Sequence, residues 1–270
     1  MTTTDSVFVG SIPAYYEKFL VPMIFEPYAR DIAERLRQLD PADVLEVATG
    51  TGVLTRAMAS ALGGDVRITA SDLNQPMLDI AMEKQGAGNR ITWKQADGQA
   101  LPFADQAFDA VACQFGVMFF PDKVKGYSEA RRVLRPGGRY IFSVWDKLEN
   151  NEFVTVLSQA LAEMFPADPP HFMERMPHGY WNLQTIGDEL KAADFSSLSV
   201  ETVDHVSHAA STLDAVTGYC MGSPLGNDIE LRAPGELASV TRTVAKALEK
   251  RFGQGPIEGK IRAHIVTAVR

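Results

Sequence analysis

Short apolar runs alternate with amphipathic stretches along the first half of the chain. The stretches 54–62, 77–85 and 122–134 have the pattern of helices, and the apolar runs between them are typical of buried strands: 43–48, 66–70, 90–95, 108–113 and 139–145. Gly63-Gly64 ends one helix, and Pro76 stands at the start of the next. These repeated strand–helix units predict a parallel sheet covered by helices on both faces, with the loops after the strands along one edge.

The pattern changes after Trp145. Helices are expected at 152–165, 183–193, 212–221 and 236–252, and strands at 197–208 and 261–269. The Pro-, Met- and His-rich segment 166–178 and the Gly/Pro segment 223–227 are expected to be irregular loops. The whole pattern predicts an α/β fold: a doubly wound, Rossmann-like, mainly parallel seven-stranded sheet with a helical cap.

The composition excludes several classes of protein. Hydrophobic residues make up 46% of the 270 residues, which is enough for a buried core and excludes a disordered chain. The 26 basic and 34 acidic residues give a net charge of −8, which argues against binding to nucleic acid or to an anionic membrane. Two cysteines make neither a disulfide framework nor a zinc site, and the five histidines lack metal-ligand spacing, so we expect no metal.

The location is predicted from what the chain lacks. Met1 to Phe8 has no basic and apolar signal-peptide pattern, and no run reaches the ~20 apolar residues of a membrane helix. We therefore expect a cytoplasmic protein without membrane insertion.

The strongest motif is Glu46-Val47-Ala48-Thr49-Gly50-Thr51-Gly52, between a strand and a helix. Its glycines allow a sharp turn and a close approach to a ligand, although a tight turn with no ligand is the alternative. Asp72 ends the next strand, 72 − 52 = 20 residues past the last glycine, and suits a ribose diol. Asp97 ends the third strand and suits an adenine edge. Each aspartate alone is more often a cap or turn residue, but their joint placement favours an adenosine site.

The type of adenosine cofactor depends on two residues. A dinucleotide fingerprint has a third glycine where this chain has Thr55, and there is no phosphate-binding Gly-Lys-Ser/Thr loop. Glu46 at the start of the loop would repel a diphosphate and would attract an ammonium or sulfonium group. Cofactors that carry phosphate are therefore disfavoured.

The motifs resemble, in order, those of class I S-adenosylmethionine-dependent methyltransferases: 44–52, 71–74, 96–98, 108–111 and 134–138. The segments 16–28 and 114–120 are similar to the small-molecule branch that includes ubiquinone/menaquinone C-methyltransferases. The resemblance implies a helical lid at 1–38, a cofactor-binding core at 39–146, and cap helices and final strands completing the sheet at 147–270. It covers the cofactor motifs and leaves the methyl acceptor undefined.

The resemblance also implies roles for single residues. Glu46 is expected to orient the methionine ammonium, Asp72 to hold the ribose hydroxyls, and Asp97 to accept from the adenine amino group. One departure from the family pattern is Ala48, which replaces the first loop glycine. The residues expected to bind S-adenosylmethionine are Tyr16, Phe25, Glu46, Ala48, Thr49, Gly50, Gly52, Asp72, Leu73, Met77, Ala96, Asp97, Gly98, Gln114, Phe115 and Gly116.

The expected reaction is methyl transfer to an O, C or N atom of a small aromatic or apolar molecule. Such an in-line displacement depends mainly on orientation, and His171 or His178 is the candidate general base. The alternatives are a nicotinamide-dependent oxidoreductase and a catalytically silent S-adenosylmethionine-binding protein. We expect a small-molecule acceptor as the partner, and a homodimer is compatible with the sequence.

Overall fold

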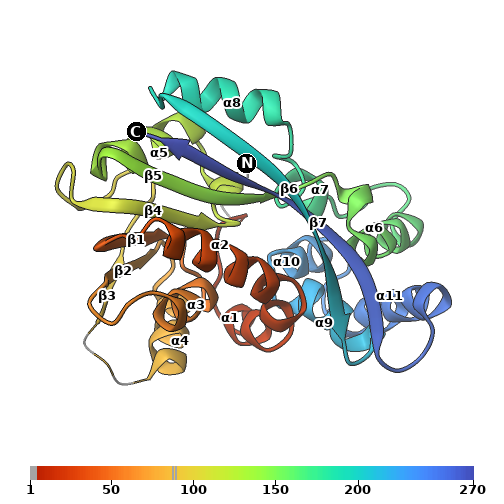
Figure 1. Cartoon of the computed structure of the whole chain (residues 1–270). Helices are drawn as coiled ribbons and strands as arrows, with labels where there is room; N and C mark the ends of the chain where they lie inside the picture. Colours follow the sequence, from red (N-terminus) through yellow and green to blue (C-terminus); the bar gives the residue numbers. More distant parts are fainter. Residues whose placement is uncertain (1–4, 87, 89) are drawn as a thin grey trace. The chain divides into compact units, whose positions relative to one another are not determined.

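A seven-stranded sheet in the order β3-β2-β1-β4-β5-β7-β6 organises the computed structural model, which describes residues 5–86, 88 and 90–270 (Figure 1). The pairs β1–β2, β1–β4, β2–β3 and β4–β5 are all parallel. The strands are β1 (Asp43–Val47), β2 (Arg67–Asp72), β3 (Ile91–Gln95), β4 (Phe108–Gln114), β5 (Leu134–Trp145), β6 (Ser197–Ala209) and β7 (Ile257–Val269).

Strand β7 runs in the opposite direction to both of its neighbours. The Asp146 N–H donates to the Arg262 carbonyl, and the Arg270 N–H donates to the Gly138 carbonyl, so residue numbers rise along β5 as they fall along β7. The same opposite order relates β6 to β7 in the pairs Ser196–Val269, Thr202–His264 and His208–Glu258. The sheet is therefore mainly parallel with one antiparallel strand, and the predicted doubly wound α/β fold is confirmed.

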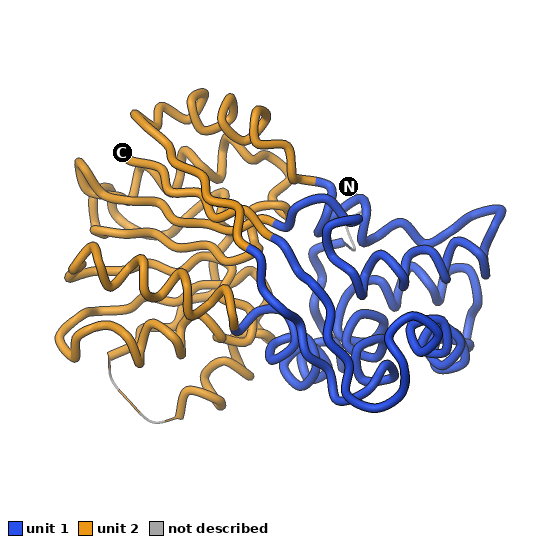
Figure 2. The backbone as a smooth tube through the Cα atoms, turned by 45° about the vertical axis from the view of Figure 1, so that its right-hand side comes forward, with its two compact units in different colours: residues 1–26, 145–179, 204–262 blue, residues 27–144, 180–203, 263–270 orange. Residues whose placement is uncertain are grey.

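The chain divides into two compact units, each built from three separate segments (Figure 2). Unit 1 contains residues 1–26, 145–179 and 204–262, and unit 2 contains residues 27–144, 180–203 and 263–270. The boundary between the units falls inside β6 and inside β7. The sequence-based division into lid, core and cap concerns function and stays a prediction, and residues 1–4 of the predicted lid lie outside the described residues.

Helices cover both faces of the sheet in unit 2. Helices α5 and α8 lie on one face, and α2, α3 and α4 lie on the other (Figure 1). Their N-termini follow local chemistry, since the side chains of Asp122 and Asn182 accept backbone N–H groups at the starts of α5 and α8. The bounds are α2 (Glu26–Gln38, which begins at the last residue of unit 1), α3 (Val53–Ala61), α4 (Gln75–Gln85), α5 (Lys123–Val133) and α8 (Leu183–Ala192).

Unit 1 is mostly helical, and one of its helical segments is a π-helix, which is wider than an α-helix. Residues Tyr16–Phe25 form a π-helix, and the Glu26 N–H donates to the Val21 carbonyl five residues earlier. Part of each segment that was predicted to be irregular is helical, namely α7 and α10. The other helices of the unit are α1 (Ile12–Tyr15), α6 (Glu152–Met164), α7 (Phe172–Arg175), α9 (Thr212–Met221), α10 (Leu225–Glu230) and α11 (Leu237–Phe252).

The connections of the fold include two short 3₁₀ turns, Val117–Phe119 and Leu148–Asn150. In the part of the chain that the structure describes, no helix combines the length and the apolar character that crossing a membrane requires.

Candidate active site

The loop after β1 has a backbone shape that is rare outside functional turns. Gly50 and Gly52 have φ values of 59° and 86°, and Ala48 also lies in the left-handed region at 57°. An L-residue pays roughly 1–2 kcal/mol there, so the loop keeps this shape at a cost. Phe115 directly after β4, the strand beside β1, has a φ of 51°. Two strained residues therefore follow adjacent strands at the edge where open α/β sheets bind ligands.

Glu46 lies on β1, immediately before this loop, and is 1% exposed. Its Oε2 accepts a hydrogen bond from the Thr55 hydroxyl of α3, at 2.5 Å. Burial raises the pKa of Glu46 from 4.5 to about 8, with a smaller raising effect from the Asp72 charge, while the Thr55 hydrogen bond lowers it. Glu46 is therefore an enclosed acid that a nearby cation would ionise.

Asp72, the last residue of β2, joins its own strand end to the glycine loop. One carboxylate oxygen accepts from the Gly50 N–H and the other from the Asn74 N–H, both at 2.8 Å. Burial raises the pKa of Asp72, and these backbone hydrogen bonds oppose the rise. Because each carboxylate oxygen has two acceptor sites, Asp72 can hold the loop and still accept hydrogen bonds from a diol.

The residues after β3 form a short turn. Asp97 is exposed, and its Oδ1 accepts from the Gln99 N–H at 2.8 Å. The Ala96 N–H donates to the Asp72 carbonyl, which joins the ends of β2 and β3. Gly98 is buried against Phe120, since a Cβ added there would lie 2.7 Å from the Phe120 Cζ atom. The turn therefore has room only for glycine at position 98.

The end of β4 brings Gln114, Phe115 and Gly116 to the same edge, and all three are buried. The Phe115 N–H donates to the Ser143 carbonyl and hydroxyl of β5, and its ring packs edge-on to Tyr28 of α2, with ring centroids 5.3 Å apart. A Cβ at Gly116 would lie 2.5 Å from the Ala48 methyl group. The loops after β1 and β4 therefore contact each other directly.

Two hydroxyl groups in the glycine loop lack partners. Thr49 and Thr51 are 4% and 1% exposed, and neither Oγ1 atom has a hydrogen-bond partner among the described residues. Buried polar groups are almost always satisfied, so two such hydroxyls in one loop fit a site for a polar ligand. The sequence reasoning missed Thr51 and Thr55, although Thr51 lies between two glycines that were already assigned to the site.

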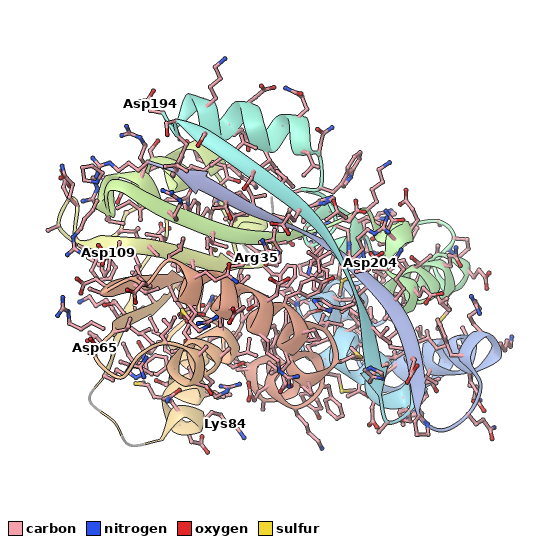
Figure 3. All side chains as sticks on the ribbon, in the orientation of Figure 1. Arg35, Asp65, Lys84, Asp109, Asp194 and Asp204 are labelled. Carbon is pink, nitrogen blue, oxygen red and sulfur yellow. The ribbon has the colours of Figure 1, made fainter. Side chains whose placement is uncertain are left out.

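The charges at the opposite end of β1 are fully paired. Asp109, labelled in Figure 3, accepts from the backbone N–H groups of Ala42 and Asp43 and from the Arg135 guanidinium. Asp43 also pairs with Arg67, whose guanidinium holds the pKa of Asp43 below its ordinary value. Unsatisfied groups on this strand and its loop therefore gather at the carboxyl end.

Leu73 and Met77, both expected against an adenine, differ in exposure. Leu73 is 49% exposed, and Met77 is 4% exposed on α4. Among the described residues, no group of three His, Cys, Asp or Glu side chains could hold a metal ion.

The remaining candidates lie in unit 1. Tyr16 and Phe25 stack on each other with ring centroids 5.0 Å apart. His171 is exposed at the start of α7, where its backbone N–H donates to Asp228. His178 is 7% exposed, and its Nδ1 lies 2.9 Å from the Asp146 carbonyl oxygen. The structure thus brings together the unit 2 candidates around the ends of β1, β2, β3 and β4, and it places these four residues in the other unit.

Comparisons with known proteins agree with this architecture. Residues 44–138 match the family described as "Methyltransferase domain". The chain is 38% identical over 112 residues to the ubiquinone/menaquinone biosynthesis C-methyltransferase UbiE of Hahella chejuensis, covering 40% of this chain and 45% of that protein. It is 42% identical over 102 residues to the demethylmenaquinone methyltransferase of Deinococcus radiodurans, covering 37% and 42%. The chain thus aligns with less than half the length of these curated relatives.

A solved structure extends the likeness of the fold over nearly the whole chain. The phosphoethanolamine N-methyltransferase 2 of Haemonchus contortus superposes with a TM-score of 0.60 at 18% identity, covering 96% of this chain and 56% of that one. Identity this low supports the fold alone. Together with the sequence matches, it confirms the resemblance to class I S-adenosylmethionine-dependent methyltransferases.

Proposed function

We propose that this chain, whose residues 44–138 are a methyltransferase domain, transfers a methyl group from S-adenosylmethionine to a small aromatic or apolar molecule. The single observation that carries the proposal is the glycine loop with its two orphan hydroxyls, Thr49 and Thr51, beside a buried acid. S-adenosylmethionine has an ammonium, a sulfonium, a carboxylate and a ribose diol, which together match these groups in polarity.

The residues of unit 2 divide the cofactor between them in this proposal. Glu46 faces the ammonium, the loop from Ala48 to Gly52 holds the polar methionine part, and Asp72 accepts from the ribose hydroxyls. Asp97, Gly98, Leu73 and Met77 surround the adenine, and Gln114, Phe115 and Gly116 bound the methionine side. When bound, the cofactor supplies an electrophilic methyl group, and the chain's contribution is to orient and enclose it.

The names of the curated relatives indicate the acceptor of this chain only in outline. The relative from Hahella chejuensis is a C-methyltransferase of ubiquinone/menaquinone biosynthesis, and the relative from Deinococcus radiodurans is a demethylmenaquinone methyltransferase. For this chain we propose an aromatic or apolar acceptor and methylation at C, O or N. His171 and His178 are the candidate bases, and a cytoplasmic location and a homodimer complete the proposal.

Thr55 argues against the nicotinamide alternative. It occupies the third glycine position of the dinucleotide fingerprint, and its hydroxyl donates to Glu46. A diphosphate would meet an enclosed acid there, since Glu46 and Asp72 are both buried. A silent cofactor-binding protein is separated from an enzyme by product formation with a panel of phenols, quinols and amines.

Isothermal titration calorimetry with S-adenosylmethionine and S-adenosylhomocysteine tests the proposal. Wild type should bind both. Asp72→Asn should bind at least about tenfold more weakly, because an amide NH₂ replaces one of the oxygens that accept N–H groups. The double substitution Thr49→Val, Thr51→Val should reduce affinity by about tenfold and leave the free energy of unfolding unchanged or higher, since it removes hydroxyls that have no partner in the free protein.

Ser207→Ala is the matched control. Ser207 of β6 is also a fully buried hydroxyl with no described partner, but it lies in unit 1 and outside the glycine loop. Ser207→Ala should leave the affinities for S-adenosylmethionine and S-adenosylhomocysteine unchanged. Absence of cofactor binding by the wild-type protein would reject the proposed function.

A further inference from the structure

A half-buried lysine stands at the first position of α5, where a positive charge does not help the helix. Lys123 follows Asp122, whose side chain accepts from the Lys125 N–H and so provides the N-terminal cap. The N-terminal end of a helix carries a partial positive charge, which favours an acidic residue and disfavours a lysine. The stability of α5 alone therefore does not explain Lys123.

The ammonium group of Lys123 turns back onto the segment that precedes the helix. Its Nζ donates to the Phe120 carbonyl at 2.7 Å and to the Met118 carbonyl at 3.1 Å. The same atom lies 5.1 Å from the centroid of the Tyr180 ring. Burial lowers the pKa of Lys123, and the Glu189 charge opposes this effect. Two carbonyl oxygens and a ring face thus replace part of the water that surrounds a surface lysine.

The carbonyl groups that Lys123 holds belong to the loop after β4. We call residues 114–120 the β4 loop, and its first three residues bound the methionine part of the cofactor in the proposed function. The next residues form the 3₁₀ turn Val117–Phe119, whose last N–H donates to the Gly116 carbonyl at 3.0 Å. Because Met118 lies inside this turn, Lys123 holds the turn and, through it, Gly116.

The start of α5 is itself tied to the turn after β3. The Asp122 N–H donates to the Gln99 side chain at 2.8 Å. Gly98, the residue before Gln99, packs against the ring of Phe120. Every residue of this arrangement belongs to unit 2. Lys123 therefore holds the β4 loop from a base that is anchored at the adenine side of the proposed site.

We propose that Lys123 is a positioning residue that keeps the β4 loop in the shape needed to bind the methionine part of S-adenosylmethionine. This deepens the proposed function and rests on it, since it assigns a role to a residue outside the cofactor contacts named above. Lys123 acts through the carbonyl groups of Met118 and Phe120. Its effect should therefore be confined to the methionine end of the cofactor.

Two probes separate the ends of the cofactor. S-adenosylhomocysteine contains the adenosine and the amino-acid part, whereas adenosine lacks the amino-acid part. Lys123→Met keeps a long side chain but removes the charge and the donors. In isothermal titration calorimetry, this variant should bind S-adenosylhomocysteine about five- to tenfold more weakly than wild type and adenosine within about twofold of wild type. A general loss of structure would weaken the binding of both probes alike.

Lys123→Arg is the rescue variant, because a guanidinium keeps the charge and can donate to both carbonyl groups. Its affinity for S-adenosylhomocysteine should stay within about twofold of wild type. Lys125→Met is the matched control, since it removes an exposed lysine from the first turn of the same helix and should leave the affinities for both probes unchanged. Equal losses for the two probes, no loss in Lys123→Met, or a loss that persists in Lys123→Arg would overturn the proposal.

A measurement on the unmodified protein covers the case in which Lys123→Met fails to fold. In ¹⁵N-lysine NMR spectra, S-adenosylhomocysteine should shift the Nζ resonance of Lys123, and adenosine should leave it in place. The resonance is identified by its absence from the spectrum of Lys123→Arg. A resonance that responds equally to both probes, or to neither, would contradict the positioning role.

The outcome is separable from that of the proposed function. Failure of the wild-type protein to bind S-adenosylmethionine and S-adenosylhomocysteine rejects the proposed function, and the positioning role with it. Normal binding by wild type together with unchanged affinity in Lys123→Met rejects only the role of Lys123.

Discussion

Glu46 keeps its proton at a pH where an exposed glutamate has lost it, because burial raises its pKa from 4.5 to about 8. Between these two values the folded protein binds a proton that the unfolded chain releases. The free energy of unfolding therefore falls as the pH rises through this window. A cation beside Glu46 would lower its pKa and so reduce this loss of stability at neutral and mildly basic pH.

Glu46→Gln isolates this effect. The amide oxygen can still accept from Thr55, but the group no longer titrates. Relative to wild type, the variant should gain roughly 1–3 kcal/mol of unfolding free energy between pH 5 and pH 8 in the absence of cofactor. Urea unfolding at a series of pH values measures the difference, and parallel curves for the two proteins would contradict the assignment. The same variant should bind S-adenosylmethionine more weakly, since it cannot carry a negative charge.

Single residues mark the limit of sequence reasoning about the site. The motif predicted that Glu46, Gly50 and Asp72 meet around one loop, and the structure gives Asp72 a hydrogen bond from Gly50. Thr55 drew attention in the sequence only as a missing glycine, although it is the donor to Glu46. That contact depends on how α3 leaves the loop, which is tertiary geometry and has no signature in residue spacing.

At the scale of elements, the ends of strands and helices can be predicted from the sequence where a Gly, Pro or Asp residue bounds an apolar run. The five N-terminal strands and α3, α4 and α5 have apolar runs bounded by Gly, Pro or Asp. Strand β7 begins at Ile257 and not at the predicted residue 261. Gly259 lies inside this longer strand, and a Cβ added there would lie 2.7 Å from Phe153 of α6, so close packing explains this glycine.

The start of β5 shows the same effect. It was predicted at residue 139, after Pro136-Gly137-Gly138, but the strand begins at Leu134. Leu134 pairs with Phe108, and the register then shifts before Arg139 pairs with Ala110. Because the first residues of such a strand have a turn-like sequence, the start of the strand cannot be predicted from the sequence pattern.

Phe120 links three elements of the site, and its packing gives an element-scale prediction. Its ring fills the space beside Gly98 in the turn after β3 and Gly126 in α5, where an added Cβ would lie 2.7 and 2.4 Å from ring atoms. Gly98→Ala should therefore destabilise the protein by roughly 1–3 kcal/mol through overpacking. Urea denaturation measures this cost.

Phe120→Leu in the Gly98→Ala background provides the check. The smaller side chain should return part of the lost stability, although Phe120→Leu alone should be destabilising because it opens a cavity. Gly137→Ala is not a suitable control, since its φ of 77° adds strain of its own, whereas Gly64→Ala has open space and no positive φ. If the two substitutions at positions 98 and 120 were simply additive, the ring would not be the obstacle.

At the scale of the whole molecule, β6 and β7 each supply residues to both units. Neither unit can unfold without breaking strands that it shares with the other. We therefore expect a single cooperative thermal transition, with equal calorimetric and van't Hoff enthalpies. Differential scanning calorimetry tests this expectation, and two resolved transitions would show that the shared strands do not couple the units.

The chain passes from one unit to the other after residues 26, 144, 179, 203 and 262. The segment that matches the methyltransferase domain, 44–138, lies wholly inside the longest uninterrupted stretch of unit 2, whereas unit 1 is assembled from three pieces. The proposed cofactor residues of unit 2, from Glu46 to Gly116, can therefore be inherited as one continuous block of sequence, whereas unit 1 changes as a whole only when three distant segments vary together.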